Sequence, residues 1–325
     1  MKNTFIRRSL ILLGLLGVVS AAVAQTSDYP SKPIRLVVGF SAGGAADTVG
    51  RALAENLAQR MGQPVVVENL AGANGNIAAD AVARSKPDGY TLYMPSIGHA
   101  VNPALYRKLN HDPIRDFSTI GLVFSAPNVL VVPASSPYRT LNDLIADARA
   151  NPGKLSFASA GNGTSVHLSA ELLKRMAKID AVHVPYRGTG SAMPDLIAGV
   201  VQFSFPNLPS ALPQVKAGKL RALGVTTENR SAAAPEIPTI AEAGVPGYRI
   251  STWYGLVAPA GLPADIRTRL NRELQLILNE PKFRERLLSQ GADPMPGSAE
   301  DFSRFLATET ERWRLLIEQS KISLE

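Results

Sequence analysis

Short apolar runs alternate with segments of helical spacing along the first third of the chain. Residues 34–40 form a β-branched run without polar alternation, which predicts a buried strand of a parallel sheet. Residues 47–61 carry apolar side chains at helical spacing and end at a glycine, as many helices do. Strands expected at 65–68 and 90–94, with a helix at 77–84 between them, complete a βαβαβ series. This order predicts a parallel sheet with helices on its faces.

The middle of the chain repeats this alternation. Two strands, at residues 120–125 and 129–132, are separated by an Ala-Pro pair and are interpreted as a crossing between domains. A strand at 220–225 is interpreted as the return crossing. The elements expected between the two crossings are a helix at 140–150, a strand at 155–158, a helix at 166–177, a strand at 181–184, a helix at 191–198, a strand at 201–205 and a helix at 208–217.

The last part of the chain is predicted to return to the first domain. A loop with a short helix at 235–246 and a strand at 253–259 precede three helices, near 263–278, 282–290 and 299–322. The sequence therefore predicts an α/β fold of two Rossmann-like domains joined by a two-strand hinge that can close a cleft. The expected domains are residues 25–124 with 226–325, and residues 125–225.

The N-terminus has the residue order of a secretory signal peptide. Basic residues at positions 2, 7 and 8 precede an apolar run at 10–19 and then Ala22-Val-Ala24. The run is too short to span a bilayer comfortably, and no later stretch approaches the roughly 20 apolar residues of a membrane helix. We therefore expect residues 1–24 to be a signal peptide that is cleaved before Gln25, which exports the remaining chain.

The composition describes a globular chain with a large core. Hydrophobic residues make up 45% of it and charged residues only 19%. The formal charge of +7 falls to +4 without the three basic residues of the signal peptide, and the Lys and Arg residues are scattered. A nucleic-acid partner is therefore not expected. The absence of cysteine from the sequence rules out disulfides and thiolate metal sites.

Two turns of small residues lie where a predicted strand passes into a predicted helix. Residues 159–165 read Ser-Ala-Gly-Asn-Gly-Thr-Ser, and residues 39–46 carry a similar run of glycine, serine and alanine. Glycine lets the backbone turn tightly beside a ligand, and the first N–H groups of a helix have no intrahelical partner. The simpler reading is that Thr164 and Ser165 only cap a helix. Two such turns facing one cleft would hold one small acid between them.

Six motifs give the chain a specific resemblance. They are Tyr29-Pro-Ser-Lys-Pro-Ile-Arg, Pro87-Asp-Gly-Tyr-Thr-Leu, Gly98-His-Ala-Val-Asn-Pro-Ala-Leu-Tyr106, Gly161-Asn-Gly-Thr-Ser-Val-His-Leu168, His183-Val-Pro-Tyr-Arg-Gly188 and Ala258-Pro-Ala-Gly261. In this order they resemble the Bug-type, TctC-like substrate-binding proteins of tripartite tricarboxylate transporters. The resemblance covers essentially the whole chain after residue 24. It implies a periplasmic, type II Venus-flytrap protein, without a cofactor, that binds a small carboxylate and passes it to membrane permease subunits.

The resemblance also implies which loops hold the ligand. In that family backbone N–H groups, hydroxyls and ordered waters hold the carboxylate without an arginine clamp. The matching positions are Phe40, Ser41, Gly43, Gly44, Asp47, Ala73, Asn74, Ser96 and His99 in the first domain, and Gly161, Asn162, Thr164, Ser165, Tyr186, Gly188 and Asn207 in the second. The chain departs from the usual pattern at Gly39, Ala42 and Pro206, so the ligand is left open among dicarboxylates, aromatic acids and acidic amino acids.

Other functions fit the sequence less well. Ser165 lies in a stretch that begins like a nucleophile elbow, but His167 stands where that turn needs glycine, so a serine hydrolase is disfavoured. The four histidines lie in separate segments without the spacing of metal ligands. Asp47 at a helix start is read either as an N-cap or as a ligand contact. A monomeric binding protein that docks on a membrane sensor instead of a permease remains an alternative.

Overall fold

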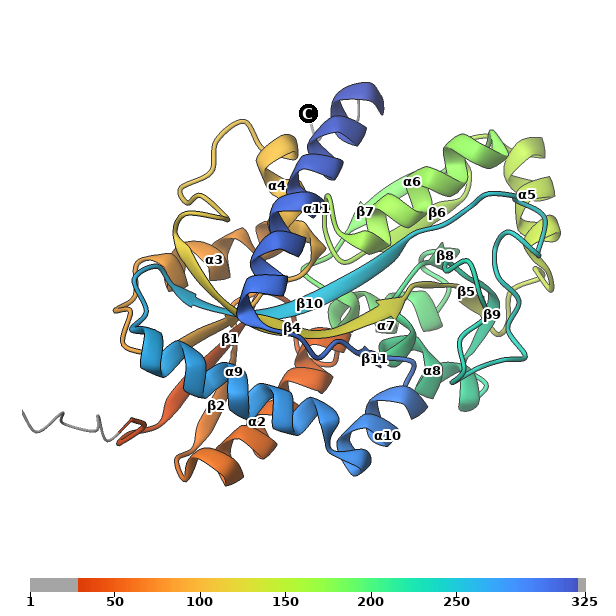
Figure 1. Cartoon of the computed structure of the whole chain (residues 1–325). Helices are drawn as coiled ribbons and strands as arrows, with labels where there is room; N and C mark the ends of the chain where they lie inside the picture. Colours follow the sequence, from red (N-terminus) through yellow and green to blue (C-terminus); the bar gives the residue numbers. More distant parts are fainter. Residues whose placement is uncertain (1–28, 321–325) are drawn as a thin grey trace, which may run out of the picture.

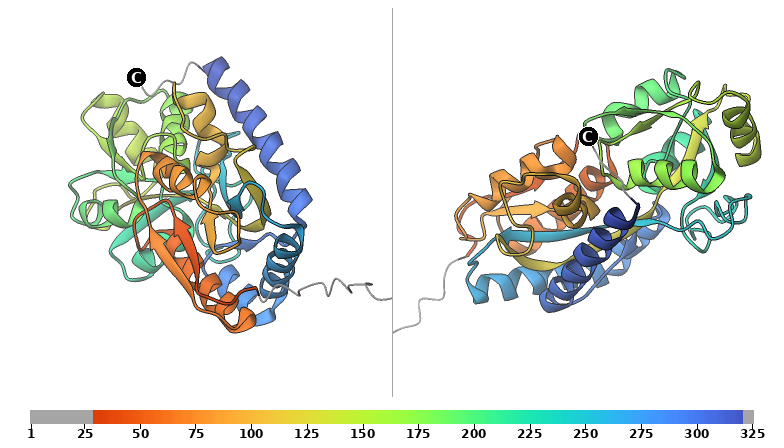
Figure 2. Two further views of the ribbon diagram at one scale, coloured as in Figure 1. Left: turned by 90° about the vertical axis from the view of Figure 1, so that its left-hand side faces the viewer. Right: turned by 90° about the horizontal axis from the view of Figure 1, so that it is seen from above.

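The apolar runs of the sequence form the strands of two separate sheets, and each sheet carries its own helices (Figures 1 and 2). The structure is a computed structural model that describes residues 29–320. We call the six-stranded sheet with its helices the first lobe and the five-stranded sheet with its helices the second lobe. The view from above in Figure 2 shows the two lobes side by side. The predicted fold class, two α/β domains of the periplasmic-binding-protein type, is confirmed.

The first lobe is built on a mixed sheet of strand order β11-β4-β10-β3-β1-β2. Three parallel strands come from the N-terminal series: β1 (Ile34–Val38), β2 (Val65–Asn69) and β3 (Thr91–Met94). Three further strands complete the sheet: β10 (Ser251–Pro259), β4 (Phe117–Pro127) and β11 (Asp293–Pro294). Strand β10 runs antiparallel to β3, β4 runs antiparallel to β10, and β11 runs antiparallel to β4. The helices are α2 (Ala45–Met61), α3 (Asn76–Ala83), α4 (Ile97–Leu105), α9 (Ala264–Asn279), α10 (Pro281–Ser289) and α11 (Ala299–Ser320), with a 3-10 turn η1 (Ala73–Gly75).

The second lobe has the strand order β7-β6-β8-β5-β9. These strands are β7 (Val182–Pro185), β6 (Ser156–Ser159), β8 (Phe203–Ser204), β5 (Val129–Pro133) and β9 (Leu220–Val225). The helices are α5 (Leu141–Ala150), α6 (Ser165–Ala177), α7 (Thr189–Ile197) and α8 (Leu208–Lys216). Strands β6, β7 and β8 are parallel, whereas β5 and β9 are antiparallel neighbours at one side.

The chain passes between the lobes at two places that lie next to each other. Strand β4 leads through Asn128 into β5, and the return lies between Ile250 and Ser251, where β10 begins beside Pro127 (Figure 1). The interpretation of residues 220–225 as the return crossing is wrong, because β9 belongs wholly to the second sheet. Residues 226–250 stay with that lobe: the Ile240 N–H donates to the Val225 carbonyl, and the Tyr248 hydroxyl donates to the Ser169 carbonyl.

Two local predictions are also wrong. The stretch after β3, expected to be a loop, is helix α4, and Gly98 lies inside this helix. The Asn74 side chain comes within 2.6 Å of the position that a Cβ on Gly98 would occupy, so a larger residue would clash there. The glycine therefore serves close packing rather than a turn. Within the part of the chain that the structure describes, the short helix expected at 235–246 is absent, and residues 226–250 form turns. The predicted signal peptide and its cleavage before Gln25 lie outside the described residues.

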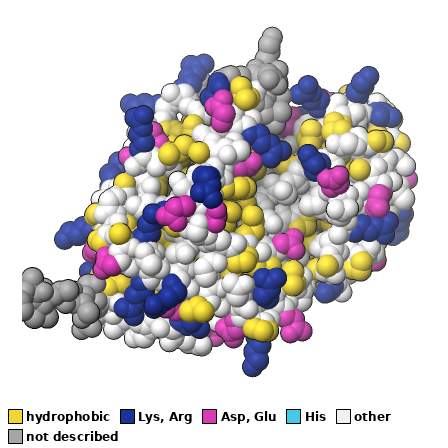
Figure 3. All heavy atoms as spheres, in the orientation of Figure 1, with side chains coloured by type: hydrophobic (Ala, Val, Ile, Leu, Met, Phe, Trp, Pro, Cys, Tyr) yellow, Lys and Arg dark blue, Asp and Glu magenta, His cyan; other side chains and the backbone are white. Residues whose placement is uncertain are grey.

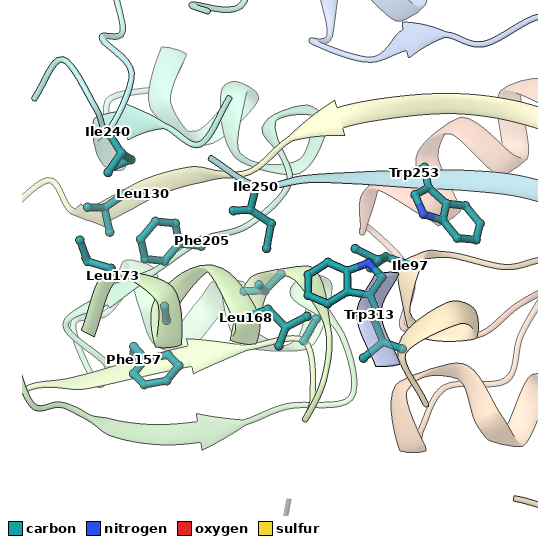
Figure 4. Close-up of a cluster of buried hydrophobic side chains, with 14 of the residues drawn as sticks. Ile97, Leu130, Phe157, Leu168, Leu173, Phe205, Ile240, Ile250, Trp253 and Trp313 are labelled. Atoms are coloured by element: carbon teal, nitrogen blue, oxygen red, sulfur yellow. The ribbon is translucent and has the colours of Figure 1, made fainter. Parts of the chain in front are cut away.

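One apolar cluster joins the two lobes. It contains Ile97 of α4 and Trp313 of α11 from the first lobe together with Leu168 of α6 from the second. Figure 4 shows Leu168 beside Trp313 and Ile97, at the point where the lobes meet. The indole N–H groups of Trp253 and Trp313 both donate to the Glu309 carboxylate, at 3.3 and 3.2 Å. The packing of α11 against the first sheet is thus tied to the lobe interface.

The contact between β10 and α11 is close enough to test. A Cβ on Gly255 would lie 2.2 Å from the Phe302 ring, which is fully buried. We expect Gly255→Ala to lower the free energy of unfolding by about 1–3 kcal/mol, the usual cost of overpacking. Urea unfolding of the variant and the wild type measures this loss of stability. Combination with Phe302→Leu should cost less than the two single changes added together, and strict additivity would contradict the contact.

The surface mixes both signs of charge. On the face drawn in Figure 3, Lys and Arg side chains are interspersed with Asp and Glu rather than gathered into one stripe. No helix within residues 29–320 combines the length and the apolar character that crossing a membrane requires.

Candidate ligand-binding site

A narrow cavity lies between the lobes, and we call it the inner cavity. The centre of a water-sized molecule can reach about 20 Å³ of it, so it admits a group of only a few atoms. Both lobes and the crossing strand β10 supply its walls. The lining residues are Phe40, Gly44, Ala45, Ala46, Ser96, Ile97, Ala160, Thr164, Ser165, Val166, Thr189, Asn207, Thr252 and Tyr254.

Five helices of the described chain begin at this cavity. Helices α2 and α4 present their first residues from the first lobe, and α6, α7 and α8 from the second. The first N–H groups of a helix have no intrahelical partner, and the helix dipole places about half a positive charge at that end. Among the described residues that line the inner cavity, none has a charged side chain. The cavity is therefore suited to an anion that is held by neutral donors.

A buried network of amides and hydroxyls fixes the floor of the inner cavity. The Tyr254 hydroxyl donates to Asn207 Oδ1 at 2.8 Å, which links β10 of the first lobe to α8 of the second. Asn207 Nδ2 donates to Asn128 Oδ1 at 3.0 Å, and Asn128 Nδ2 donates to Ser165 Oγ at 3.3 Å. Burial raises the pKa of Tyr254, so its hydroxyl stays a neutral donor. The crossing point at Asn128 and the cavity thus share one network.

A larger outer cavity adjoins the inner one and shares Phe40 and Ala160 with it. About 220 Å³ of it is open to the centre of a water-sized molecule. Its other lining residues are Gly39, Gly72, Ala73, Asn74, Tyr106, Gly161, Asn162, Pro185, Tyr186 and Arg187. A ligand with its acidic group in the inner cavity can extend its remaining atoms here.

Asp47 shapes the loop that follows β1. Its carboxylate accepts hydrogen bonds from the Gly43 N–H at 2.9 Å and from Asn69 Nδ2 at 3.0 Å, and it pairs with Arg51 at 2.8 Å. Burial acts to raise the pKa of Asp47, but the bonds from Arg51, Gly43 and Asn69 outweigh it and lower that pKa. Asp47 is the third residue of α2, and Gly44 is the N-cap. Its carboxylate is therefore occupied in holding the loop.

The same loop touches the second lobe directly. The Ser41 N–H donates to the Arg187 carbonyl at 3.4 Å, and the Ser191 N–H donates to Ser41 Oγ at 3.3 Å. A Cβ on Gly188 would lie 2.5 Å from Ser41 Oγ, so glycine at that turn permits the approach. These contacts close the lobes over the cavities.

The glycine-rich turn of the second lobe, residues 159–164, forms the entry to α6, and we call it the cradle loop. Gly161 and Gly163 have φ of 120° and 75°, a region that glycine reaches without strain. Thr164 is the N-cap: its Oγ accepts from the His167 N–H and donates to the Gly161 carbonyl. The helix-cap reading of Thr164 is therefore correct, and the same residue also lines the inner cavity.

Comparisons with known proteins identify the family. The family model "Tripartite tricarboxylate transporter family receptor", TctC, matches residues 49–322. The chain belongs to this receptor family. It is 35% identical to protein BugT of Bordetella pertussis over 97% of each chain. The predicted resemblance to Bug-type, TctC-like binding proteins is thereby confirmed.

Two solved structures resemble the fold closely. One is Rpa4515 of R. palustris with adipate, at a TM-score of 0.88 and 38% identity, covering 91% of this chain and 100% of that one. The other is MatC of Rhodopseudomonas palustris with bound malate, at a TM-score of 0.84 and 32% identity, covering 89% and 100%. Adipate and malate are both small carboxylates. Family and fold are those of periplasmic solute-binding proteins rather than of enzymes.

The receptor brings most of the predicted site residues to the cavities. Phe40, Gly44, Ser96, Thr164, Ser165 and Asn207 line the inner one, and Ala73, Asn74, Gly161, Asn162 and Tyr186 line the outer one. Ser41, Gly43 and Gly188 hold the closing loops instead, and Asp47 holds the first of them. Their predicted contact with a ligand stays a prediction.

The structure places His99 elsewhere. Its ring is buried between Tyr93, His111 and Phe117, and Nε2 lies 3.0 Å from the Pro113 carbonyl. It lines neither cavity, so we do not keep it among the proposed ligand contacts. The prediction treated the residues after β3 as a loop, whereas in helix α4 the third residue turns into the core of the lobe.

Sequence reasoning missed several residues of the cavity walls. Thr252 and Tyr254 line the inner cavity from β10, and Thr189 lines it from the start of α7. Tyr106 and Arg187 line the outer cavity. The two residues of β10 share one face because side chains two apart along a strand point the same way. The two-residue alternation of a strand could have shown that Thr252 and Tyr254 share a face. It could not have shown that this face lies between the lobes, because that depends on the crossing at Ser251.

The arrangement of serines and histidines does not support a hydrolase. Ser165 Oγ accepts from Asn128, while His167 Nδ1 accepts from the Gly163 N–H, so the two side chains have separate partners. Ser159 Oγ and His183 Nε2 lie 2.6 Å apart, but Ser159 is buried and lines neither cavity. Within residues 29–320, no group of three or more His, Asp or Glu side chains is placed to hold a metal ion.

The double role of Thr164 gives a prediction. Thr164→Ala removes the N-cap of α6 and should lower the free energy of unfolding by about 1 kcal/mol. The same change should weaken carboxylate binding, since the hydroxyl also ties the cradle loop to the helix. Urea unfolding and calorimetric titration measure the two effects. Thr164→Ser keeps the hydroxyl and is the matched control; equal losses in both variants would mean that the methyl group, not the cap, matters.

Proposed function

We propose that the receptor captures a small organic carboxylate between its lobes and delivers it to the membrane subunits of a tripartite tricarboxylate transporter. One observation carries the proposal: five helix N-termini converge on the inner cavity, whose lining residues carry no charged side chain. Such a site favours an anion through N–H groups and helix dipoles. The relatives named with adipate and malate support the same ligand class.

Neutral donors supply enough affinity for this role. A hydrogen bond to a charged group contributes roughly 1.5–3 kcal/mol. Three or four such bonds, after the cost of ordering the ligand, support a Kd near 1 μM, which corresponds to about −8 kcal/mol. We propose that the acidic group lies in the inner cavity, against Ser165, Asn207 and the first N–H groups of α2 and α6. The rest of a dicarboxylate, aromatic acid or acidic amino acid then occupies the outer cavity.

The proposal extends to the export and shape of the protein. We propose that residues 1–24 are removed before Gln25 and that the remaining chain works in the periplasm as a monomer. We further propose that its second domain extends to residue 250, because residues 226–250 bond to β9 and α6. The hinge then consists of the two adjacent passages at Asn128 and Ser251.

A thermal-shift panel tests the binding step. The panel contains adipate, malate, glutamate, benzoate and phthalate, each with its uncharged amide as the matched control. An acid present at 100 times its Kd should stabilise the protein by about 2.7 kcal/mol, while its amide should not. If no acid raises the melting temperature, or if acid and amide act equally, the anion site is wrong. Uptake of a binding acid into vesicles that contain the membrane subunits, with and without the receptor, tests delivery.

A further inference from the structure

A pair of histidines packs behind the cradle loop. His167 comes from α6 and His183 from β7, and their rings stack at 4.1 Å between centroids with an angle of 18°. Phe157 of β6 stacks against His183 at 4.9 Å. Neither histidine lines the inner or the outer cavity. The pair therefore acts on a ligand only through the loop that it supports.

Both histidines connect to glycine N–H groups of the cradle loop. The Gly163 N–H donates directly to His167 Nδ1 at 3.1 Å. The Gly161 N–H donates to Ser159 Oγ at 3.0 Å, and that oxygen lies 2.6 Å from His183 Nε2. The Ser159 hydroxyl has one proton and two acceptor lone pairs, so while it accepts from Gly161 it can either donate to His183 Nε2 or accept from it. Only the connection through His167 therefore requires a ring nitrogen without a proton.

The surroundings of the pair favour this neutral form. Burial lowers the pKa of His167 to about 4, with Lys174 acting in the same direction. Burial, His167 and Lys174 likewise lower the pKa of His183 to about 4, against an opposing effect of Glu171. Glu171 lies 3.9 Å from His167 Nε2 but is paired with Lys174 at 3.0 Å, and Lys174 also lies 4.0 Å from Asp180. The carboxylate of Glu171, which lies beside the His167 ring, is therefore already paired with the Lys174 ammonium group.

We propose that His167 is a positioning residue for ligand binding: its unprotonated Nδ1 holds the cradle loop in its binding conformation, protonation releases it, and His183 supports the ring by stacking against it. A proton on His167 Nδ1 turns the acceptor of the Gly163 N–H into a donor, so that hydrogen bond is lost. A proton on either ring also places a positive charge against its stacked partner. Acid conditions then lower the affinity for a carboxylate through the loop. The effect on carboxylate affinity rests on the proposed function, whereas the hydrogen bond between Gly163 and His167 does not.

The geometry can be tested without any ligand. Nitrogen NMR of the histidine rings should show His167 neutral at pH 6 with the proton on Nε2, where an ordinary histidine carries substantial charge. Hydrogen exchange of the Gly163 amide, relative to its intrinsic rate at each pH, should speed up as the pH falls through about 4, the pKa of the pair. A charged His167 ring at pH 6, or a Gly163 amide whose protection is independent of pH and of the residue at 167, would overturn the proposal.

Matched variants separate positioning from simple stability. In His167→Asn the Oδ1 atom stands in for Nδ1 and does not titrate, so this variant should bind as tightly as the wild type at pH 7 and more tightly at pH 4. His167→Leu removes the acceptor and should weaken binding about tenfold at both pH values, the equivalent of one lost hydrogen bond. His111→Asn, in the first lobe, is the control and should leave affinity unchanged.

Adipate, malate and benzoate serve as probes, and each affinity is expressed relative to the wild type so that the titration of the acid itself cancels. Asn and Leu variants that bind equally at both pH values would contradict the positioning role while leaving carboxylate binding intact. If the wild type binds none of the probes, the proposed function fails for them, and the NMR and exchange results still decide the inference.

Discussion

Gly190→Ala is expected to keep the two lobes apart and to weaken carboxylate binding by about a hundredfold or more, a loss of about 2.7 kcal/mol. A Cβ on Gly190 would lie 1.8 Å from the carbonyl oxygen of Ala42 and 3.0 Å from its carbonyl carbon. Both atoms belong to the backbone of the opposite lobe, so no side chain can move aside. Gly190 lies inside α7, where alanine is favoured over glycine by roughly 1 kcal/mol. The second lobe itself should therefore fold normally.

Small-angle scattering and calorimetric titration measure this prediction together. The variant should have a larger radius of gyration than the wild type, with and without a binding acid. Gly297→Ala is the matched control, because its Cβ would meet only the Asp301 side chain, at 3.6 Å, an ordinary contact. A Gly190→Ala protein with wild-type affinity and unchanged scattering would show that the lobes do not close as the structure has them.

Acid should destabilise the receptor strongly through His99. Burial, together with the repulsion of His111, lowers the pKa of His99 to about 3, whereas an unfolded histidine titrates near 6.5. Unfolding therefore takes up a proton below about pH 6.5, and stability is lost as the pH falls from there toward 3. By pH 4 the loss from this one residue is about 3 kcal/mol, at 1.36 kcal/mol per pH unit.

Urea unfolding at pH 7, 5.5 and 4 measures the loss. His99→Gln is the matched variant, because its amide can still donate to the Pro113 carbonyl and does not titrate. The variant should be less stable than the wild type at pH 7 and should lose less stability on acidification. A stability difference between the two proteins that stays constant from pH 7 to 4 would show that His99 is not the group responsible.

The fold could be predicted largely from the period of apolar positions. Strands such as β1 and helices such as α2 are continuous runs whose spacing is decided locally, and the predicted and observed bounds differ by one or two residues. The return crossing between the lobes could not be recognised from local sequence. Residues 220–225 look like any buried strand, and only their pairing with β5 shows that the chain remains in the second lobe until Ser251.

The shape of the candidate site was predictable where glycine chemistry marks a turn. Gly161 and Gly163 have the positive φ that the cradle loop needs, and Thr164 caps the helix that follows. His99 shows where the motif failed, because its position in a helix turns the ring into the core. Tyr254 could not be assigned from sequence, since it reaches the cavity only through the pairing of distant strands.

The position of Trp313 has a practical consequence. The chain has two tryptophans, and Trp313 packs where Leu168 of the second lobe meets the first (Figure 4). Separation of the lobes would bring water to this indole, and an indole in water emits at longer wavelength than a buried one. The protein therefore contains its own optical reporter, and the speed of closure after rapid mixing with an acid can be followed by intrinsic fluorescence without a label.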